Sequence, residues 1–153
     1  MATRGIYNIN MDAKGRMALP AKLRAHLPND GAGLLVCTID VQSRCLVIYP
    51  EDEWSSVEEQ LQSLPSLDIK SRRFKRLILG HASDLEPDSN GRVLIPSVLR
   101  EFASLDKKIV VLGQAKKIEV WDETAWVKER ELALDEVADD FEELSESMMS
   151  LSI

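Results

Sequence analysis

Two short motifs in this sequence carry chemistry that a turn alone does not require. Residues 12–16 read DAKGR and residues 88–92 read DSNGR, so an arginine directly follows a D-x-x-G turn in both places. Asp accepts backbone hydrogen bonds in such a turn and Gly is free to adopt positive φ, but neither role involves Arg16 or Arg92. A fixed guanidinium suits phosphate oxygens and guanine edges, and Lys14 adds a second cation to the first turn. The paired turns therefore predict contact with nucleic acid.

A simpler interpretation of each motif is an ion pair across the turn between its Asp and its Arg. Such a pair is worth only about 0–1 kcal/mol when exposed. For one isolated D-x-x-G-R motif, an uninformative turn is the better interpretation. Two copies with the arginine at the same position favour a function for it.

The two motifs belong to a longer internal repeat. Residues 12–27 and 88–103 align at an offset of 76, and a second block, 46–54 and 118–126, aligns at an offset of 72. The second copy is therefore four residues shorter between the blocks. The first blocks share six identical pairs, which are Asp12/Asp88, Gly15/Gly91, Arg16/Arg92, Pro20/Pro96, Leu23/Leu99 and Arg24/Arg100. This pattern predicts two related modules in tandem.

Local patterns predict the elements that position the turns. Residues 6–11 alternate in polarity as a half-buried strand does, and residues 16–19 form the return strand, so each copy is expected to form a hairpin around its turn. A short helix that begins at Pro20 or Pro96 is expected to follow. Buried strands are expected at 34–39, 45–49, 109–112 and 118–121. Helices are expected at 54–64 and 67–82, and an acidic helix over 135–151 with one apolar stripe made of Val137, Phe141, Leu144 and Met148.

The distribution of charge leaves a DNA partner possible. The formal net charge is −7, but residues 118–153 alone carry −10, so the preceding residues carry +3. The acidity belongs to one tail, and the remainder does not repel a polyanion. A basic cluster occupies the second linker helix and comprises Lys70, Arg72, Arg73, Lys75 and Arg76. We interpret it as solvated surface or an ion-pair partner of the acidic helix, with a second DNA surface as the alternative.

Other classes of protein have weaker support. His81 with Asp84 and Glu86, or Cys37 with the distant His26, would be the raw material of a small hydrolase, but no phosphate loop, H-E-x-x-H or nucleophile elbow accompanies them. Cys37 and Cys45 lack C-x-x-C spacing, so we expect buried core residues, no metal site, no cofactor and a reducing cytoplasm. No signal peptide and no run of 18 apolar residues is present, so a membrane partner is not expected. An AbrB-like antitoxin or assembly module remains a further alternative.

Several motifs in order resemble the MraZ family of bacterial transcriptional regulators. They are the two D-x-x-G-R turns, CTID at 37–40, GHAS at 80–83, LGQ at 112–114 and EVWD at 119–122. The resemblance covers nearly the whole chain. It implies an α+β fold in which two tandem SpoVT-AbrB-like swapped-hairpin modules form a small barrel. It further implies ring-shaped oligomers in the nucleoid. These would bind short direct repeats in promoters, usually to repress the cell-division and cell-wall gene cluster that includes their own operon.

The resemblance also assigns roles to residues. Arg16 and Lys14 are the first choices for DNA contact and Arg92 is next, while Asn90 occupies the position of Lys14 in the second turn. Four further residues shape the two turns, namely Asp12, Gly15, Asp88 and Gly91. The expected organisation is module 1 at 6–53, a helical linker at 54–81, module 2 at 82–125 and a helical tail at 126–153.

Overall fold

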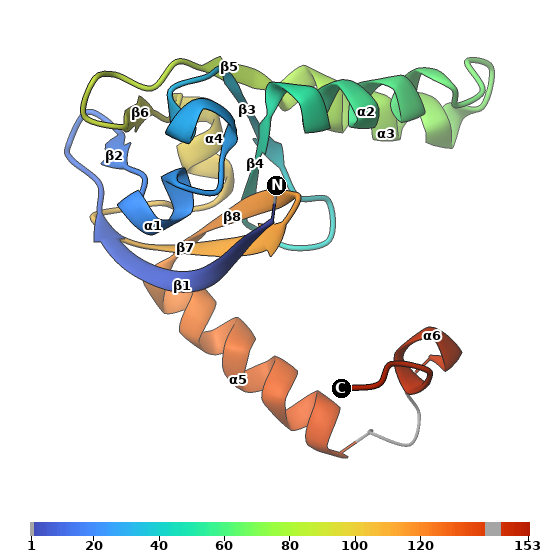
Figure 1. Cartoon of the computed structure of the whole chain (residues 1–153). Helices are drawn as coiled ribbons and strands as arrows, with labels where there is room; N and C mark the ends of the chain where they lie inside the picture. Colours follow the sequence, from blue (N-terminus) through green and yellow to red (C-terminus); the bar gives the residue numbers. More distant parts are fainter. Residues whose placement is uncertain (1, 140–144) are drawn as a thin grey trace. The chain divides into compact units, whose positions relative to one another are not determined.

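The computed structural model describes residues 2–139 and 145–153. The chain forms two compact units, Met1–Glu123 and Thr124–Ile153, and each is considered by itself. The first unit combines strands and helices, as the α+β class requires (Figure 1). No helix in the described part is long and apolar enough to cross a membrane.

Strands of the first unit form a large sheet and a small ribbon. The large sheet has six antiparallel strands in the order β1-β7-β8-β4-β3-β5, and the ribbon pairs β2 with β6. Hydrogen bonding among the described residues does not close these strands into a barrel. The strands are β1 (Thr3–Asn10), β2 (Arg16–Ala18), β3 (Leu35–Ile39), β4 (Leu46–Pro50), β5 (Ser83–Leu85), β6 (Arg92–Leu94), β7 (Lys108–Ala115) and β8 (Lys117–Asp122).

The expectation of a hairpin within each copy is wrong. The backbone N–H of Asp12 donates to the carbonyl of Arg16, and that of Asp88 donates to the carbonyl of Arg92, each at 2.9 Å. Apart from these bonds, β1 pairs with β7 and β2 pairs with β6. The two return strands prefer each other because Met17 and Val93 lie opposite one another and are both 1% exposed. The copies therefore exchange strands, as the family resemblance implied.

The two copies share one hydrophobic core. Leu23 and Leu99 occupy equivalent positions in the repeat, and each is fully buried. The same cluster contains Ile48 from β4 and Ile118 from β8, so both blocks of both copies contribute. Burying one such side chain is worth about 1.5–3 kcal/mol, and here that gain depends on the presence of both copies.

The helices of the first unit connect its strands. Pro20 and Pro96 stand immediately before the short helices α1 (Ala21–Arg24) and α4 (Ser97–Phe102), as expected. A 3-10 segment, η1 (Pro28–Gly31), follows α1. The linker forms α2 (Glu51–Gln62) and α3 (Ile69–His81). The carboxylate of Asp68 caps α3 by accepting from the N–H groups of Lys70 and Ser71.

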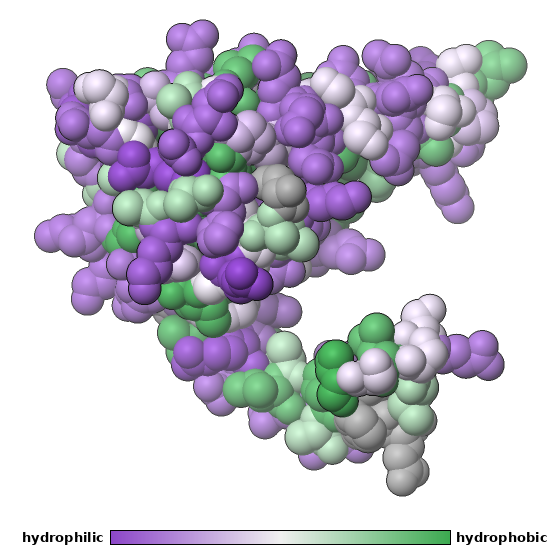
Figure 2. All heavy atoms as spheres, in the orientation of Figure 1, coloured by the Kyte–Doolittle hydropathy of each residue, from purple (hydrophilic) through white to green (hydrophobic). Residues whose placement is uncertain are grey.

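The second unit differs from the expected helix over 135–151. Helix α5 (Glu123–Asp139) begins earlier, and a separate short helix α6 (Glu146–Met149) starts after Ser145, whose hydroxyl accepts from the N–H of Met148. Of the expected apolar stripe, Val137 and Met148 are about half exposed, whereas Phe141 and Leu144 lie outside the described residues. No described residue of α5 is buried. Figure 2 shows apolar residues on the surface of this unit.

Candidate nucleic-acid interface

The first D-x-x-G-R turn is held by a single carboxylate. Oδ1 of Asp12 accepts the backbone N–H groups of Lys14 and Arg16, each at 2.9 Å. Oδ2 accepts the side-chain Nε–H of Arg16 at 3.1 Å. Gly15 adopts φ +91° and donates its N–H to the carbonyl of Asp12. Asp12 therefore fixes both the backbone of the turn and the direction of the arginine.

The second turn repeats this geometry closely. Oδ1 of Asp88 accepts the N–H groups of Asn90 and Arg92 at 2.8 and 2.9 Å, and Oδ2 accepts Nε–H of Arg92 at 2.9 Å. Gly91 has φ +74°. Asp12 and Asp88 thus accept matching hydrogen bonds in the two turns, and Gly15 and Gly91 both adopt positive φ.

The ion pair that formed the simpler interpretation is present in both turns, and it leaves part of each guanidinium open. Only Nε of Arg16 and Arg92 contacts the carboxylate. Within the described part of the chain, the terminal nitrogens of these two side chains have no protein partner. The side chains are 40% and 45% exposed. An arginine that is oriented at Nε and open at its outer edge can still donate two parallel hydrogen bonds.

Hydrogen bonding lowers the pKa of both turn carboxyls. For Asp12, donation by the backbone N–H of Arg16 is the largest cause of the lowered pKa, and the N–H of Lys14 and the Arg16 guanidinium act in the same direction. Asp88 has a lowered pKa for the matching reason, led by the N–H of Arg92. Both groups are therefore carboxylates at neutral pH and can orient their arginines there.

Each turn rests on an arginine from the other copy, a feature that the sequence analysis missed. A Cβ built on Gly15 would lie 2.5 Å from Nε of Arg100, and one built on Gly91 would lie 2.7 Å from Cζ of Arg24. Nε of Arg24 donates to the carbonyl of Leu19 at 3.0 Å, and Nε of Arg100 donates to that of Ile95 at 2.9 Å. The presence of arginine at this position in both copies was the sequence feature that could have indicated a role for Arg24 and Arg100.

Backbone bonds also cross between the copies beside the turns. The N–H of Leu19 donates to the carbonyl of Gly91, and the N–H of Ile95 donates to that of Gly15. The two turns therefore flank one ribbon, β2-β6, at the end of the first unit that is remote from α2 and α3 (Figure 1). Lys14, Arg16, Asn90 and Arg92 are brought to this one end.

The second turn has fewer cations near it than the first. Asn90 stands where the first turn has Lys14, and both side chains are exposed. Lys107 lines a hollow next to the first turn, but so does the acidic Asp106, so Lys14 accounts for the difference. The positive charge around the two turns is therefore unequal although their backbones match.

The basic cluster on α3 lies far from these turns, at the opposite end of the first unit (Figure 1). Its members Lys70, Arg72, Arg73, Lys75 and Arg76 form no ion pair with the described residues of the first unit. The expected pairing with the acidic helix, which belongs to the second unit, stays a prediction. A solvated surface is consistent with the exposure of most of these side chains.

Residues proposed for enzyme chemistry are not assembled into a site. Nδ1 of His81 bonds to the carbonyl of Leu77 at 2.6 Å, and the described structure records no bond from His81 to Asp84 or Glu86. Burial raises the pKa of the Cys37 thiol to about 12, so it is not a thiolate at neutral pH. His26 is exposed and forms no recorded hydrogen bond with Cys37.

Both cysteines are buried and not disulfide-bonded, as expected of core residues. One group of possible metal ligands was not visible from spacing, because it joins the loop between β3 and β4 to strand β8: ligand atoms of Asp40, Cys45 and Glu119 lie within 4.8 Å of one another. Its carboxylates already accept hydrogen bonds, Asp40 from the loop that follows it and Glu119 from the indole of Trp121. The absence of a metal stays a prediction.

The fold and the site place this chain in a class of tandem-repeat α+β proteins, in which two modules exchange strands and each carries an arginine-bearing turn. The family model that matches it is described as "MraZ protein, putative antitoxin-like", and it matches twice, at residues 2–77 and 78–148. The chain belongs to the MraZ family, which confirms the resemblance seen in the sequence.

Curated relatives agree with this assignment over nearly their whole length. "Transcriptional regulator MraZ" of Marinomonas sp. (strain MWYL1) is 48% identical over 151 residues, covering 98% of this chain and 99% of the relative. The protein of the same name from Hydrogenovibrio crunogenus is 48% identical, with 98% and 97% covered. That of Coxiella burnetii (strain RSA 493 / Nine Mile phase I) is 43% identical, with 98% and 99% covered.

Proposed function

We propose that this protein is a sequence-specific DNA-binding transcriptional regulator that acts in the cytoplasm, in association with the nucleoid, without enzymatic activity. The observation that carries the proposal is the pair of turns in which an Asp carboxylate orients an arginine at Nε and leaves its outer edge open. The names of the curated relatives support it. As in the family it resembles, its targets are the promoters of the cell-division and cell-wall gene cluster, including its own operon, which it represses.

The turns are suited to reading a duplex in two ways. The outer edge of Arg16 can donate two hydrogen bonds to O6 and N7 of one guanine, which distinguishes bases, while Lys14 neutralises a phosphate, which does not. Fixing Arg16 in advance reduces the side-chain entropy lost on binding. Arg92 can act in the same way, but Asn90 leaves its turn with less attraction for the backbone.

DNA binding by one subunit would be weak. Its two turns offer about two or three cations within reach of phosphates, so the slope of log affinity against log salt is expected to be about −2 to −3. Joining subunits in a ring makes the later contacts intramolecular and raises avidity by roughly 10²–10⁴. Subunits related by rotation present their turns in the same direction along the duplex, so short direct repeats are the matching target.

A binding-site selection on random duplexes, followed by affinity measurements on one, two and three copies of the selected repeat, tests the proposal. We expect a steep gain with each added copy, and a loss when half a helical turn is inserted between copies. Sedimentation of each complex gives the number of subunits bound. Equal affinity for one and three repeats would exclude the avidity mechanism, and selection of no sequence would exclude specific recognition.

An antitoxin-like or assembly role is the second candidate, because the matching family model carries that description. The exposed acidic helix α5 offers a surface for a protein partner. Deleting residues 124–153 distinguishes the two. A regulator whose contacts lie in the turns keeps its choice of DNA sequence without them, whereas a module that acts through α5 loses its partner.

A further inference from the structure

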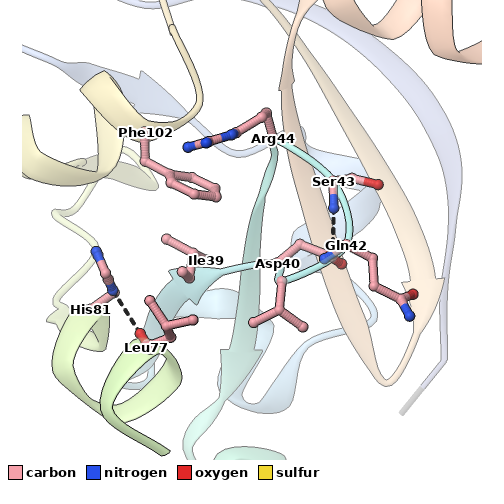
Figure 3. Close-up of a pocket in the computed structure, with 9 residues that line it drawn as sticks. Ile39, Asp40, Gln42, Ser43, Arg44, Leu77, His81 and Phe102 are labelled. Atoms are coloured by element: carbon pink, nitrogen blue, oxygen red, sulfur yellow. Dashed lines mark hydrogen bonds between the residues drawn. The ribbon is translucent and has the colours of Figure 1, made fainter. Parts of the chain in front are cut away.

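A hollow of about 450 Å³ lies beside the loop that joins β3 to β4. The loop, residues 40–45, forms one wall, the end of α3 forms another, and Phe102 at the end of α4 forms a third (Figure 3). This volume falls in the range of sites that take small molecules. The hollow lies outside the two D-x-x-G-R turns.

The loop that lines this hollow is long in one copy of the repeat only. Strands β7 and β8 are separated by the single residue Lys116, whereas residues 40–45 separate β3 from β4. Strand β1 pairs with β7 over eight residues, whereas the equivalent pairing of β5 with β3 covers three. The end of α3 lies beside β3 where that shorter pairing stops. The hydroxyl of Thr38 donates to the carbonyl of Ile78 at 2.6 Å and ties α3 there. The duplicated fold by itself therefore does not require this hollow.

An arginine and a histidine border the hollow. Cζ of Arg44 lies 4.7 Å from the centroid of the Phe102 ring, and no described carboxylate lies within ion-pairing distance of Arg44. His81 leans on the same ring, with centroids 6.2 Å apart. Because Nδ1 of His81 contacts a carbonyl oxygen, it must carry a proton, so Nε2 of the neutral ring is an acceptor and can donate to an anion only when the ring is doubly protonated. Arg44 and His81 appear on two sides of Phe102 in Figure 3.

The remaining lining fixes the chemical character of an occupant. Ile39, Leu77 and Phe102 supply an apolar floor. Among the described lining residues one carboxylate occurs, that of Asp40, whose Oδ1 accepts the backbone N–H groups of Gln42 and Ser43 at 2.7 and 3.0 Å and is thereby held to its own loop. We propose that this hollow binds a small anion with a flat apolar body, an aryl carboxylate or an aryl phosphate ester, whose charge pairs with Arg44 while its ring packs beside Phe102 and His81.

A ligand in this hollow would be connected to the first DNA turn through one short helix. Phe102 and Arg100 both belong to α4, and Arg100 supports Gly15 of the first turn. A ligand that moves Phe102 therefore changes the support under Lys14 and Arg16. This coupling rests on the proposed function, and it is reciprocal, because DNA must change the affinity for the ligand by the same factor.

Titration of the ¹⁵N-labelled full chain with phenyl phosphate, benzoate, benzyl alcohol and inorganic phosphate tests the site. We expect phenyl phosphate or benzoate to shift the amide resonances of residues 39–44 and 77–81, and the better of the two to show whether phosphate or carboxylate is preferred. Benzyl alcohol lacks the charge and phosphate lacks the ring, so each should bind at least tenfold more weakly. Arg44→Gln should weaken the better anion at least tenfold.

Lys116→Gln is the matched control, because Lys116 is the exposed cation in the corresponding turn of the other copy, and it should leave binding unchanged. Benzyl alcohol binding as tightly as the anions, an unchanged affinity in Arg44→Gln, or shifts confined to other surfaces would each overturn the site.

The coupling has its own measurement, which is the affinity for the better anion with and without a saturating repeat duplex. A changed affinity supports the coupling, and an unchanged one refutes it while leaving the site in place. Arg16→Gln should still bind the anion, so failure of the DNA proposal and failure of the site are distinguishable.

Discussion

The two D-x-x-G-R turns have nearly the same internal geometry and different surroundings. In each, one carboxylate accepts two backbone N–H groups and one Nε–H, and an arginine of the opposite copy lies beneath the glycine. The first turn carries Lys14, whereas the second has Asn90 at the same position. The shape of a turn is therefore set by a few local atoms, while its attraction for DNA is set by neighbours that are free to vary.

The largest effect is expected from removing the arginine of the first turn. Arg16→Gln should lower affinity for a repeat duplex by more than 100-fold, because each bidentate base contact is worth about 1–3 kcal/mol and the loss recurs in every subunit. Arg92→Gln should lower it by about tenfold. Fluorescence anisotropy at fixed salt measures both, with circular dichroism to confirm folding. Equal losses would show that Lys14 does not distinguish the turns.

Removing a glycine should affect the two turns equally. Gly15→Ala and Gly91→Ala force a side chain into positive φ, which costs about 1–2 kcal/mol, and push against the arginine below. We expect each to lower the midpoint of thermal unfolding by about 2–8 °C, at about 2–4 °C per kcal/mol. Midpoints that fall by clearly different amounts in the two variants would contradict the matched geometry.

Giving the second turn a cation sharpens the comparison. Asn90→Lys should raise affinity for random duplex DNA a few-fold and steepen the salt slope by about 0.9 per subunit that contacts the duplex. Sequence preference should not change, because phosphate contacts carry no base information. Gln114→Lys, an exposed position on β7, is a control for net charge. An equal gain from that control would remove the second turn from the interface.

The smallest effect concerns pH. A folded-state pKa below the ordinary value means that Asp12 stabilises the folded state above about pH 4, and that this contribution is lost as pH falls through the lowered pKa. Asp12→Asn should therefore melt at a lower temperature than the parent at pH 7, and the difference should shrink towards pH 3. Asp88→Asn should behave alike. A difference that is independent of pH would contradict the lowered pKa.

What the sequence could predict was local. The turn, its glycine and the proline before each short helix follow from residues close together in the chain, and all were found. Pairing of β2 with β6 did not follow, because each strand has three residues and its partner lies about 76 positions away. The hairpin was expected instead because the nearest complementary segment is favoured when only the local pattern is known.

Packing between the copies explains the other omissions. Arg24 and Arg100 occupy identical positions of the repeat, but each acts on a glycine of the opposite copy. An alignment of one copy on the other does not reveal that contact. The helix expected over 135–151 is interrupted at Ser145, where a serine hydroxyl bonds to the backbone and caps a new helix. The periodicity of apolar residues does not show whether a serine side chain will bond to the backbone and interrupt a helix.

The reciprocal support of the turns has a consequence for the origin of the gene. Because Arg100 completes the turn of Gly15, and Arg24 completes that of Gly91, one copy alone leaves its own turn without support. A single-module ancestor would have met this need by pairing with an identical partner, as a symmetric homodimer. Two copies in one chain supply that partner permanently, and they allow the two turns to differ, with Lys14 in one and Asn90 in the other.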